Sequence, residues 1–110
     1  INDLKNRIRE KRQLNKKYTK MFNIIKNFYI FKEPKNCKSN YWLQTIMLNK
    51  DKIDQRKKII LFFNSKKVEI RPVWKILSSL DFLKKYPKMK IEEAFNLEKR
   101  ILNLPSSSNL

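Results

Sequence analysis

The chain has 110 residues, enough for one small domain, and 41% of them are hydrophobic, which can fill a modest core. It has no histidine and one cysteine, Cys37, so Ser-His and Cys-His nucleophile systems, His-ligated metal sites and an internal disulfide are excluded. The single cysteine fits a reducing cytoplasm, and no apolar run is long enough to span a bilayer, so we expect a cytoplasmic chain without a membrane partner.

The formal net charge of +17 allows two interpretations. One is a freestanding basic module that binds nucleic acid through phosphate contacts. The other is a solvated surface with a biased composition, since 21 lysines stand against six arginines and accompany thirteen isoleucines and twelve asparagines. Arginine would be more frequent where phosphates or bases are bound in a bidentate manner, so the second interpretation is favoured.

The first element is a long amphipathic helix predicted over residues 3–30, with Asn2 or Asp3 able to cap its start. Its apolar stripe recurs near the helical period and its other face is rich in Lys and Arg. Glycine is absent, so turns that need a positive φ are expected to use Asn or Asp. The opening residues and the missing glycine lead us to expect a piece of a longer protein.

The middle of the chain alternates between strand and helix signals. Residues 41–48 are rich in β-forming residues and predict a strand with both faces partly buried. Asp51 follows in a turn and can cap a helix over 52–64. Residues 68–71 alternate as another strand, and pairing should loosen or end at Pro72, which lacks a backbone donor.

The last third is predicted to contain shorter elements. They are a short helix around 79–85, a helix over 92–99, a short strand or extended exit over 101–105, and a loop at Ser106–Ser108. The whole order predicts an α/β layered unit with few strands.

Three segments carry a more specific pattern. They are residues 33–48, which contain Ser39-Asn40-Tyr41-Trp42-Leu43, the segment Arg71-Pro72-Val73-Trp74-Lys75, and residues 94–107. Together they resemble the C-terminal region of the DegT/DnrJ/StrS-type nucleotide-sugar aminotransferases, which depend on pyridoxal 5'-phosphate. The sequence is most similar to the branch acting on UDP-linked 4-keto-6-deoxy amino sugars, as in bacillosamine and legionaminic acid synthesis.

The resemblance implies the small C-terminal domain of a fold-type I transferase, with few, mostly antiparallel strands packed against helices. Residues 1–30 would be an interdomain helix and residues 31–110 the small domain. The large domain, with the Schiff-base lysine and most cofactor contacts, would lie outside this chain. No catalytic residue is therefore expected here, and the chain alone should be inactive.

The complete enzyme is expected to move an amino group from L-glutamate to a 4-keto-6-deoxy UDP-amino sugar, in surface glycan or nonulosonic acid biosynthesis. The resemblance also implies pyridoxal 5'-phosphate as cofactor and a homodimeric assembly. Nucleic acid is not an expected partner of such an enzyme.

Four residues match motif positions that the resemblance places near the substrate. Arg71 is a candidate substrate contact, and Trp74 a flat wall for the sugar or base. Asn40 and Trp42 would support the strand that leads toward the cleft. From residue type alone, Arg71 could equally be a surface charge at a strand end, and Trp74 would be expected in the core.

The sequence departs from the family pattern at two places. Lys67 stands where the family usually has glycine, which predicts a different turn before the strand. Ser78 stands where the family usually has histidine, so we expect the loss of a hydrogen bond, either to the substrate or to a residue behind the substrate site.

Overall fold

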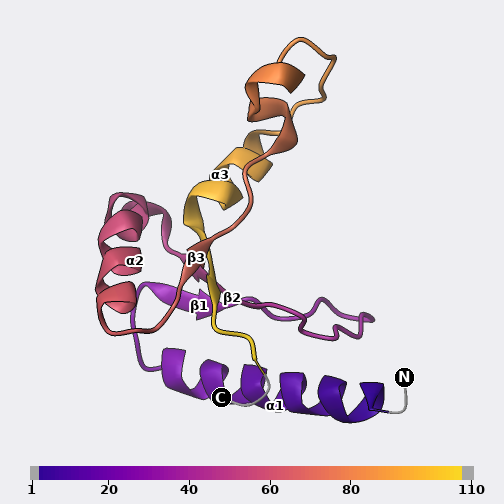
Figure 1. The fold of residues 1–110 in the computed structure, drawn as a ribbon, viewed down its shortest axis with the longest axis vertical. Helices are drawn as coiled ribbons and strands as arrows, with labels where there is room; N and C mark the ends of the chain where they lie inside the picture. The colour runs from indigo at the N-terminus through magenta and orange to yellow at the C-terminus, as the bar shows by residue number, and fades with distance from the viewer. Residues whose placement is uncertain (1–2, 108–110) are drawn as a thin grey trace.

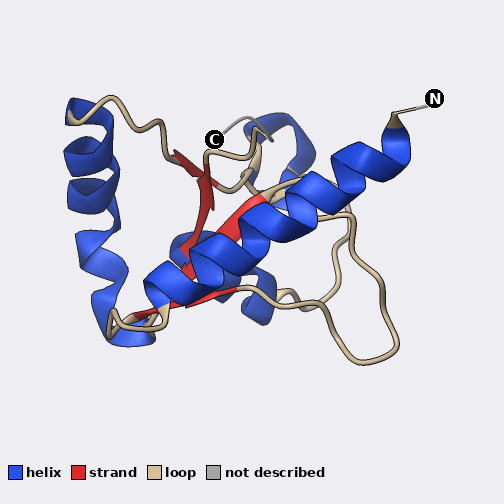
Figure 2. Ribbon diagram, turned by 90° about the horizontal axis from the view of Figure 1, so that it is seen from below, coloured by secondary structure: helices blue, strands red, loops and turns tan. Residues whose placement is uncertain are grey.

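The computed structural model describes residues 3–107, and within them it contains a four-stranded antiparallel sheet with helices on both sides (Figure 1). The strands lie in the order β1 (Phe28–Ile30), β2 (Gln44–Leu48), β4 (Ile101–Leu104) and β3 (Arg71–Pro72). Figure 2 shows helix α1 (Leu4–Phe22) crossing the strands on one face. The mixed helix and antiparallel sheet architecture confirms the predicted fold class.

The first helix is shorter than predicted, because α1 ends at Phe22 rather than at Ile30. Asn23 takes the C-cap position, and Asn27 adopts a left-handed φ of 83° that turns the chain back. The residues after this turn form β1 and pair with β2. The apolar pattern continues across the turn because Phe22 and Ile30 enter the same core from two different elements.

The centre of the sheet is formed by β2 and β4. Ile46 and Leu102 are partners in the register, and both side chains have 0% exposure. The prediction of a strand at the end of the chain is confirmed by β4. β2 begins at Gln44, later than predicted, because Tyr41 has a φ of 47° and is not extended.

The helix predicted over 52–64 begins as a 3-10 helix, η1 (Lys50–Gln55), and continues as α2 (Arg56–Ser65). Asp51 lies inside η1, and Asn49 takes the N-cap position, so the prediction that Asp51 caps this helix is wrong. The tighter 3-10 turn starts the helix earlier than the apolar pattern indicated.

The strand predicted over 68–71 forms further along the chain, as β3 at Arg71–Pro72. β3 ends at Pro72, which is paired with Leu102, and only a long hydrogen bond of 3.4 Å follows, from the Val73 N–H to the Ile101 carbonyl oxygen. The prediction that pairing loosens or ends at Pro72 is therefore confirmed. The proline is tolerated because β3 is an edge strand, where a missing donor disrupts no ladder.

After β3 the chain leaves the sheet as an arm, residues 73–91, which extends away from the strands in Figure 1. The helix predicted around 79–85 is instead two 3-10 helices, η2 (Leu77–Ser79) and η3 (Asp81–Leu83). The chain returns through α3 (Glu92–Arg100), which confirms the predicted last helix to within one residue.

The core lies between the sheet, the end of α1 and α2. Its buried members are Phe22, Ile30, Ile46, Leu48, Ile70, Leu102 and Leu104. Two buried polar links join the surrounding elements to β2: Arg100 donates Nε to the Leu48 carbonyl oxygen at 2.7 Å, and Asn15 donates Nδ2 to Gln44 Oε1 at 3.1 Å. These bonds leave the buried amides and guanidinium satisfied.

Candidate functional site

A pocket of about 340 Å³ opens beside the edge strand β3. Its walls come from β3, from the start of the arm, from the chain that leaves β4 and from the residue before β2. The lining residues are Leu43, Glu69, Arg71, Pro72, Trp74, Asn103, Leu104, Pro105, Ser106 and Ser107. Two of the four predicted site residues, Arg71 and Trp74, therefore share one pocket.

Arg71 presents its guanidinium on the exposed side of this pocket. Its side chain is 72% exposed, and Nε donates to Glu69 Oε1 at 2.9 Å. Exposed ion pairs contribute only about 0–1 kcal/mol, so a ligand anion can compete with Glu69 for the same donors. A planar guanidinium in this position can hold a phosphate or carboxylate through two parallel bonds.

Trp74 and Trp42 form an exposed indole pair. Their side chains are 67% and 66% exposed, and the rings stack with centroids 6.4 Å apart and an interplanar angle of 27°. The expectation from residue type that Trp74 belongs to the core is therefore wrong. Two adjacent exposed indoles offer a flat apolar face to a ring-shaped ligand.

Asn40 acts on the chain just before the indole pair. Its Oδ1 accepts a hydrogen bond from the backbone N–H of Trp42 at 3.0 Å, a local turn typical of asparagine. Asn40 therefore stabilises the turn that precedes Trp42. The strand begins two residues after Trp42, at Gln44. Asn40, Trp42, Trp74 and Arg71 form one continuous patch through these contacts and the shared pocket.

Sequence reasoning missed the contribution of the chain after β4, which was interpreted as a plain loop. Ser106 lines the pocket, and its Oγ accepts the Gln44 N–H at 2.8 Å. Lys11 donates to the Ser106 carbonyl oxygen, and the Tyr18 hydroxyl donates to the Pro105 carbonyl oxygen at 2.9 Å. Burial raises the pKa of the Tyr18 phenol, which keeps it a donor. The run of serines was the available signal; Ser108 lies outside the described residues.

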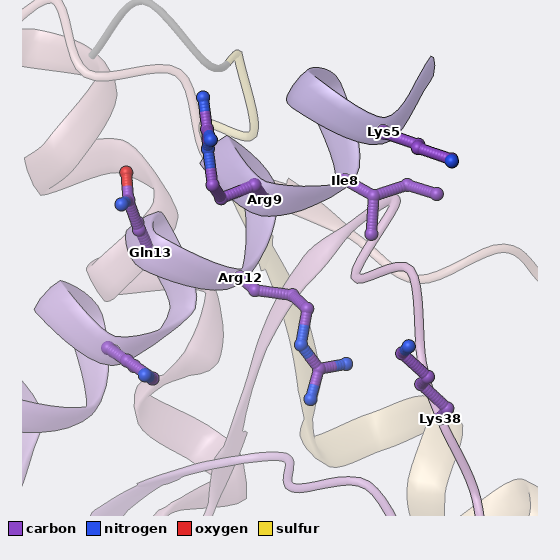
Figure 3. A pocket seen from close by; sticks show the side chains of 7 residues that line it. Lys5, Ile8, Arg9, Arg12, Gln13 and Lys38 are labelled. Atoms are coloured by element: carbon purple, nitrogen blue, oxygen red, sulfur yellow. The ribbon is translucent and has the colours of Figure 1, made fainter.

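A second, larger hollow of about 610 Å³ lies between α1 and the loop that contains Lys38, and it is lined mostly by cationic side chains (Figure 3). Figure 3 shows Lys5 and Arg9 pointing in different directions, whereas Arg12 points from α1 toward the loop. Lys5 and Arg9 diverge, and Arg12 is already paired with Glu33, so these cations do not converge on one point as an anion site would require.

The described residues contain no group of His, Cys, Asp and Glu side chains arranged to hold a metal ion. None of the helices in residues 3–107 combines the length and apolar character needed to cross a membrane.

A model of the DegT/DnrJ/EryC1/StrS aminotransferase family matches residues 1–110. The chain belongs to this family. No curated protein matches it in sequence.

Solved sugar-aminotransferase structures show the same fold as this DegT/DnrJ-family chain. The aminotransferase TlmJ from Streptoalloteichus hindustanus superposes with a TM-score of 0.85 at 14% identity, over 99% of this chain and 29% of that one. DesI, solved in the presence of its TDP-sugar product, gives 0.87 at 13% identity, over 99% and 28%. Helicobacter pylori PseC, an aminotransferase of pseudoaminic acid biosynthesis, gives 0.83 at 14% identity, over 94% and 28%. The chain thus spans less than a third of the length of these relatives.

The turn before β3 contains Lys67 at the position where the family usually has glycine. Lys67 adopts a φ of 60°, the left-handed conformation that glycine reaches without strain. The N–H of Lys67 donates to the Asn64 carbonyl oxygen at 3.0 Å, which closes this turn behind α2. Asn64 Oδ1 also accepts the Ile70 N–H at 3.0 Å, so the turn leads directly into β3.

Proposed function

We propose that this chain is the small domain of a nucleotide-sugar aminotransferase and forms the sugar-nucleotide side of the active site. The complete enzyme would transfer an amino group from L-glutamate to a UDP-linked 4-keto-6-deoxy amino sugar, in bacillosamine- or legionaminic acid-type glycan biosynthesis, as a cytoplasmic homodimer. In this division the interdomain helix expected within residues 1–30 is α1, which ends at Phe22, and residues 31–110 form the small domain together with β1, whose residues Phe28–Ile30 pair with β2.

The proposal is supported by the family match along the whole chain and by folds shared with sugar aminotransferases. The single observation that carries it is the exposed pair of Trp42 and Trp74 beside Arg71. A sugar nucleotide combines planar or ring-shaped apolar faces with a diphosphate, and this patch combines indole faces with a guanidinium.

The family implies pyridoxal 5'-phosphate, which supplies an electron sink when bound. The described residues that line the Arg71 pocket include no lysine, so they do not fit the Schiff-base end of a cofactor site. We therefore assign to this chain only substrate binding and orientation, with the cofactor held mainly by a large domain outside it. The chain alone is accordingly expected to lack transaminase activity.

The test is to measure the two half-reactions of the full-length enzyme separately by stopped-flow. Arg71→Ala should lower kcat/KM for the sugar nucleotide by roughly ten- to a hundredfold, because charged hydrogen bonds contribute about 1.5–3 kcal/mol each. Arg71→Lys should restore only part of this, since the planar fork is lost. The L-glutamate half-reaction should stay nearly unchanged.

Arg7→Ala is the matched control. Arg7 is 69% exposed and pairs with Asp3 through Nε at 3.0 Å, as Arg71 pairs with Glu69, but it does not line the pocket. If Arg71→Ala slows the glutamate half-reaction and spares the sugar one, Arg71 binds the carboxylate of the amino donor and the assignment is wrong.

The structure offers no specific support for the nucleic-acid alternative. The cationic hollow beside α1 has diverging side chains, and one of its arginines, Arg12, is engaged by a carboxylate. Any binding to nucleic acid is expected to be weak, independent of sequence and abolished by moderate salt.

A further inference from the structure

Arg12 is the one side chain lining the cationic hollow that reaches across to the facing loop. It donates Nη2 to Glu33 Oε1 at 2.6 Å and Nη1 to Glu33 Oε2 at 3.0 Å, which makes a bidentate ion pair between α1 and the end of the β1 segment. The two side chains are only 31% and 25% exposed. This pair is better shielded than the exposed Arg7–Asp3 and Arg71–Glu69 pairs of the same chain.

The same two residues also hold both backbone polar groups of Ser39. Arg12 Nη1 donates to the Ser39 carbonyl oxygen at 2.6 Å, and the Ser39 N–H donates to Glu33 Oε2 at 2.6 Å. A loop residue six positions from Glu33 is thereby fixed against α1 from both sides. We call Arg12, Glu33, Ser39 and Tyr41 the loop clamp.

Tyr41 completes the loop clamp and carries its strain. The Arg12 guanidinium lies over the Tyr41 ring, 5.4 Å from the centroid, and the Tyr41 hydroxyl oxygen accepts the Glu33 N–H at 3.3 Å. Its own N–H donates to Ser39 Oγ at 3.0 Å, while its φ is 47°. A tyrosine keeps a left-handed backbone only where its surroundings determine it from several sides, as they do here.

Trp42 is the next residue along the chain, and nothing as strong as the loop clamp acts on it directly. Its indole is 66% exposed, and its only aromatic partner in the described residues is Trp74. An exposed aromatic pair is too weak to order a loop of ten residues. The backbone of Trp42 is held by Asn40 Oδ1, which accepts its N–H at 3.0 Å, and by a long contact of 3.4 Å from Lys11 Nζ to its carbonyl oxygen, and β2 begins two residues later at Gln44. On the side of the loop, the position of Trp42 therefore depends on the backbone that the loop clamp fixes.

We propose that Arg12 and Glu33 are positioning residues that set the indole of Trp42 against Trp74 by fixing the loop from residue 33 to residue 42. The effect on substrate rests on the proposed sugar-nucleotide function, whereas the effect on the indole pair does not. The experiment therefore has one readout for each.

The first readout is fluorine NMR of the full-length protein labelled with 5-fluorotryptophan, without substrate. The Trp42 and Trp74 resonances are assigned by Trp42→Phe and Trp74→Phe. Arg12→Ala and Glu33→Gln should shift and broaden both assigned resonances. Arg7→Ala and Asp3→Asn remove the exposed ion pair at the start of the same helix and should leave both unchanged. Unchanged resonances in Arg12→Ala and Glu33→Gln would overturn the proposal.

The second readout is the pair of half-reactions in the same variants. Arg12→Ala should raise KM for the sugar nucleotide by about tenfold and leave the L-glutamate half-reaction unchanged, because displacement of a binding group by about 1 Å can cost this much or more. Arg12→Lys, which keeps the charge but not the fork, should give an intermediate value. Equal losses in both half-reactions would indicate a merely structural role and overturn the proposal.

The two readouts separate the failure of this proposal from the failure of the proposed function. Shifted tryptophan resonances with an unchanged KM would leave the loop clamp standing and show that the indole pair does not bind the sugar nucleotide. Should Arg12→Ala fail to fold, Glu33→Gln decides, since it keeps the shape of the side chain and removes only its charge.

Discussion

Strand β4 has a different neighbour on each side, and the two neighbours differ in length and burial. On one side, β2 supplies five residues, and Ile46 lies against Leu102 with both side chains at 0% exposure. On the other side, β3 supplies only Arg71 and Pro72, and both are exposed. One pairing buries apolar area and stabilises the domain, and the other leaves an edge with polar and aromatic side chains available to a ligand.

This difference implies that substitutions in the two pairings should affect different measurements. Changes in the β2–β4 pairing should appear in stability, and changes at the β3 edge should appear in substrate binding with little loss of stability. The two pairings share Leu102 and Asn103 of β4, and further polar contacts join them at the strand ends, such as the bond from the Gln44 N–H to Ser106 Oγ.

The largest expected effect is in the centre of the sheet. Ile46→Ala removes a fully buried side chain and should lower the free energy of unfolding by about 2–5 kcal/mol, because a cavity is left in a packed core. Chemical denaturation measures this loss. Ile24→Ala is the same change at a side chain that is 86% exposed and should have little effect. Similar losses for both variants would contradict the burial described here.

A smaller effect is expected at the edge. Trp74→Ala should reduce kcat/KM for the sugar nucleotide by about tenfold, which corresponds to about 1.4 kcal/mol, and should change the melting temperature little because the side chain is mostly exposed. Phe82→Ala removes an aromatic side chain of similar exposure, 69%, that lies on the arm and does not line the pocket. A large loss of stability in Trp74→Ala without a kinetic effect would place Trp74 in a structural role.

The centre of the sheet was also easier to predict than the edge, for a physical reason. Burial imposes a repeating apolar pattern, so β4 and α3 were predicted nearly to the residue, and β2 was missed only at its start. The late end of the predicted first helix and the early start of the predicted β2 fall where the backbone adopts a left-handed conformation, at Asn27 and Tyr41, which no apolar period records. The other misses fall at 3-10 helices and at the edge strand β3, where little side-chain area is buried. The expectation that Asn or Asp would fill such positions holds for only two of the four in the described residues, namely Asn27 and Asn36.

The candidate site was predictable only through its motifs. Arg71 and Trp74 were chosen from a resemblance, whereas residue type alone indicated the opposite burial for Trp74. The proximity of Trp42 to Trp74 and of Ser106 to Arg71 depends on contacts between distant segments, which a single sequence does not specify.

The turn that leads into the edge strand allows a third prediction. Lys67→Gly should raise the free energy of unfolding by about 0.5–1 kcal/mol, since a non-glycine residue at φ 60° carries a steric cost that slightly exceeds the entropic cost of glycine. Lys66→Gly is the matched control: its φ is −90°, so glycine brings no steric relief and should destabilise by a similar amount. Denaturation of the two variants beside the wild type measures both. A loss of stability in Lys67→Gly would show that the turn gains nothing from glycine.

The smallest effect concerns the loop clamp and pH. The hydrogen bonds from Arg12, followed by the N–H of Ser39, hold the pKa of Glu33 below its ordinary value, and Lys38 adds a weaker attraction. A carboxylate with a lowered folded-state pKa stabilises the fold fully above its unfolded pKa, and this contribution disappears as the pH falls through the folded-state pKa. Glu33→Gln should therefore lower the melting temperature at neutral pH, and the difference from the wild type should shrink as the pH falls below the ordinary pKa of a glutamate, about 4.3, and through the lowered folded-state pKa.

The same series in an Arg12→Ala background tests the cause of this pH dependence. With the first and largest source of the lowered pKa removed, Glu33→Gln should change the melting temperature less at neutral pH, and the change should vary less with pH. Tyr41 remains in this background, with its hydroxyl against the Glu33 N–H, so the loop retains part of its order. The alternative outcome is that the difference in melting temperature between Glu33→Gln and the wild type keeps its full size at acidic pH. In that case the charge of the Glu33 carboxylate contributes nothing to stability, and the shape of the side chain alone orders the loop. The loop at the binding edge would then be fixed by packing, as the centre of the sheet is, and the contrast between the two regions would be weaker than the contacts indicate.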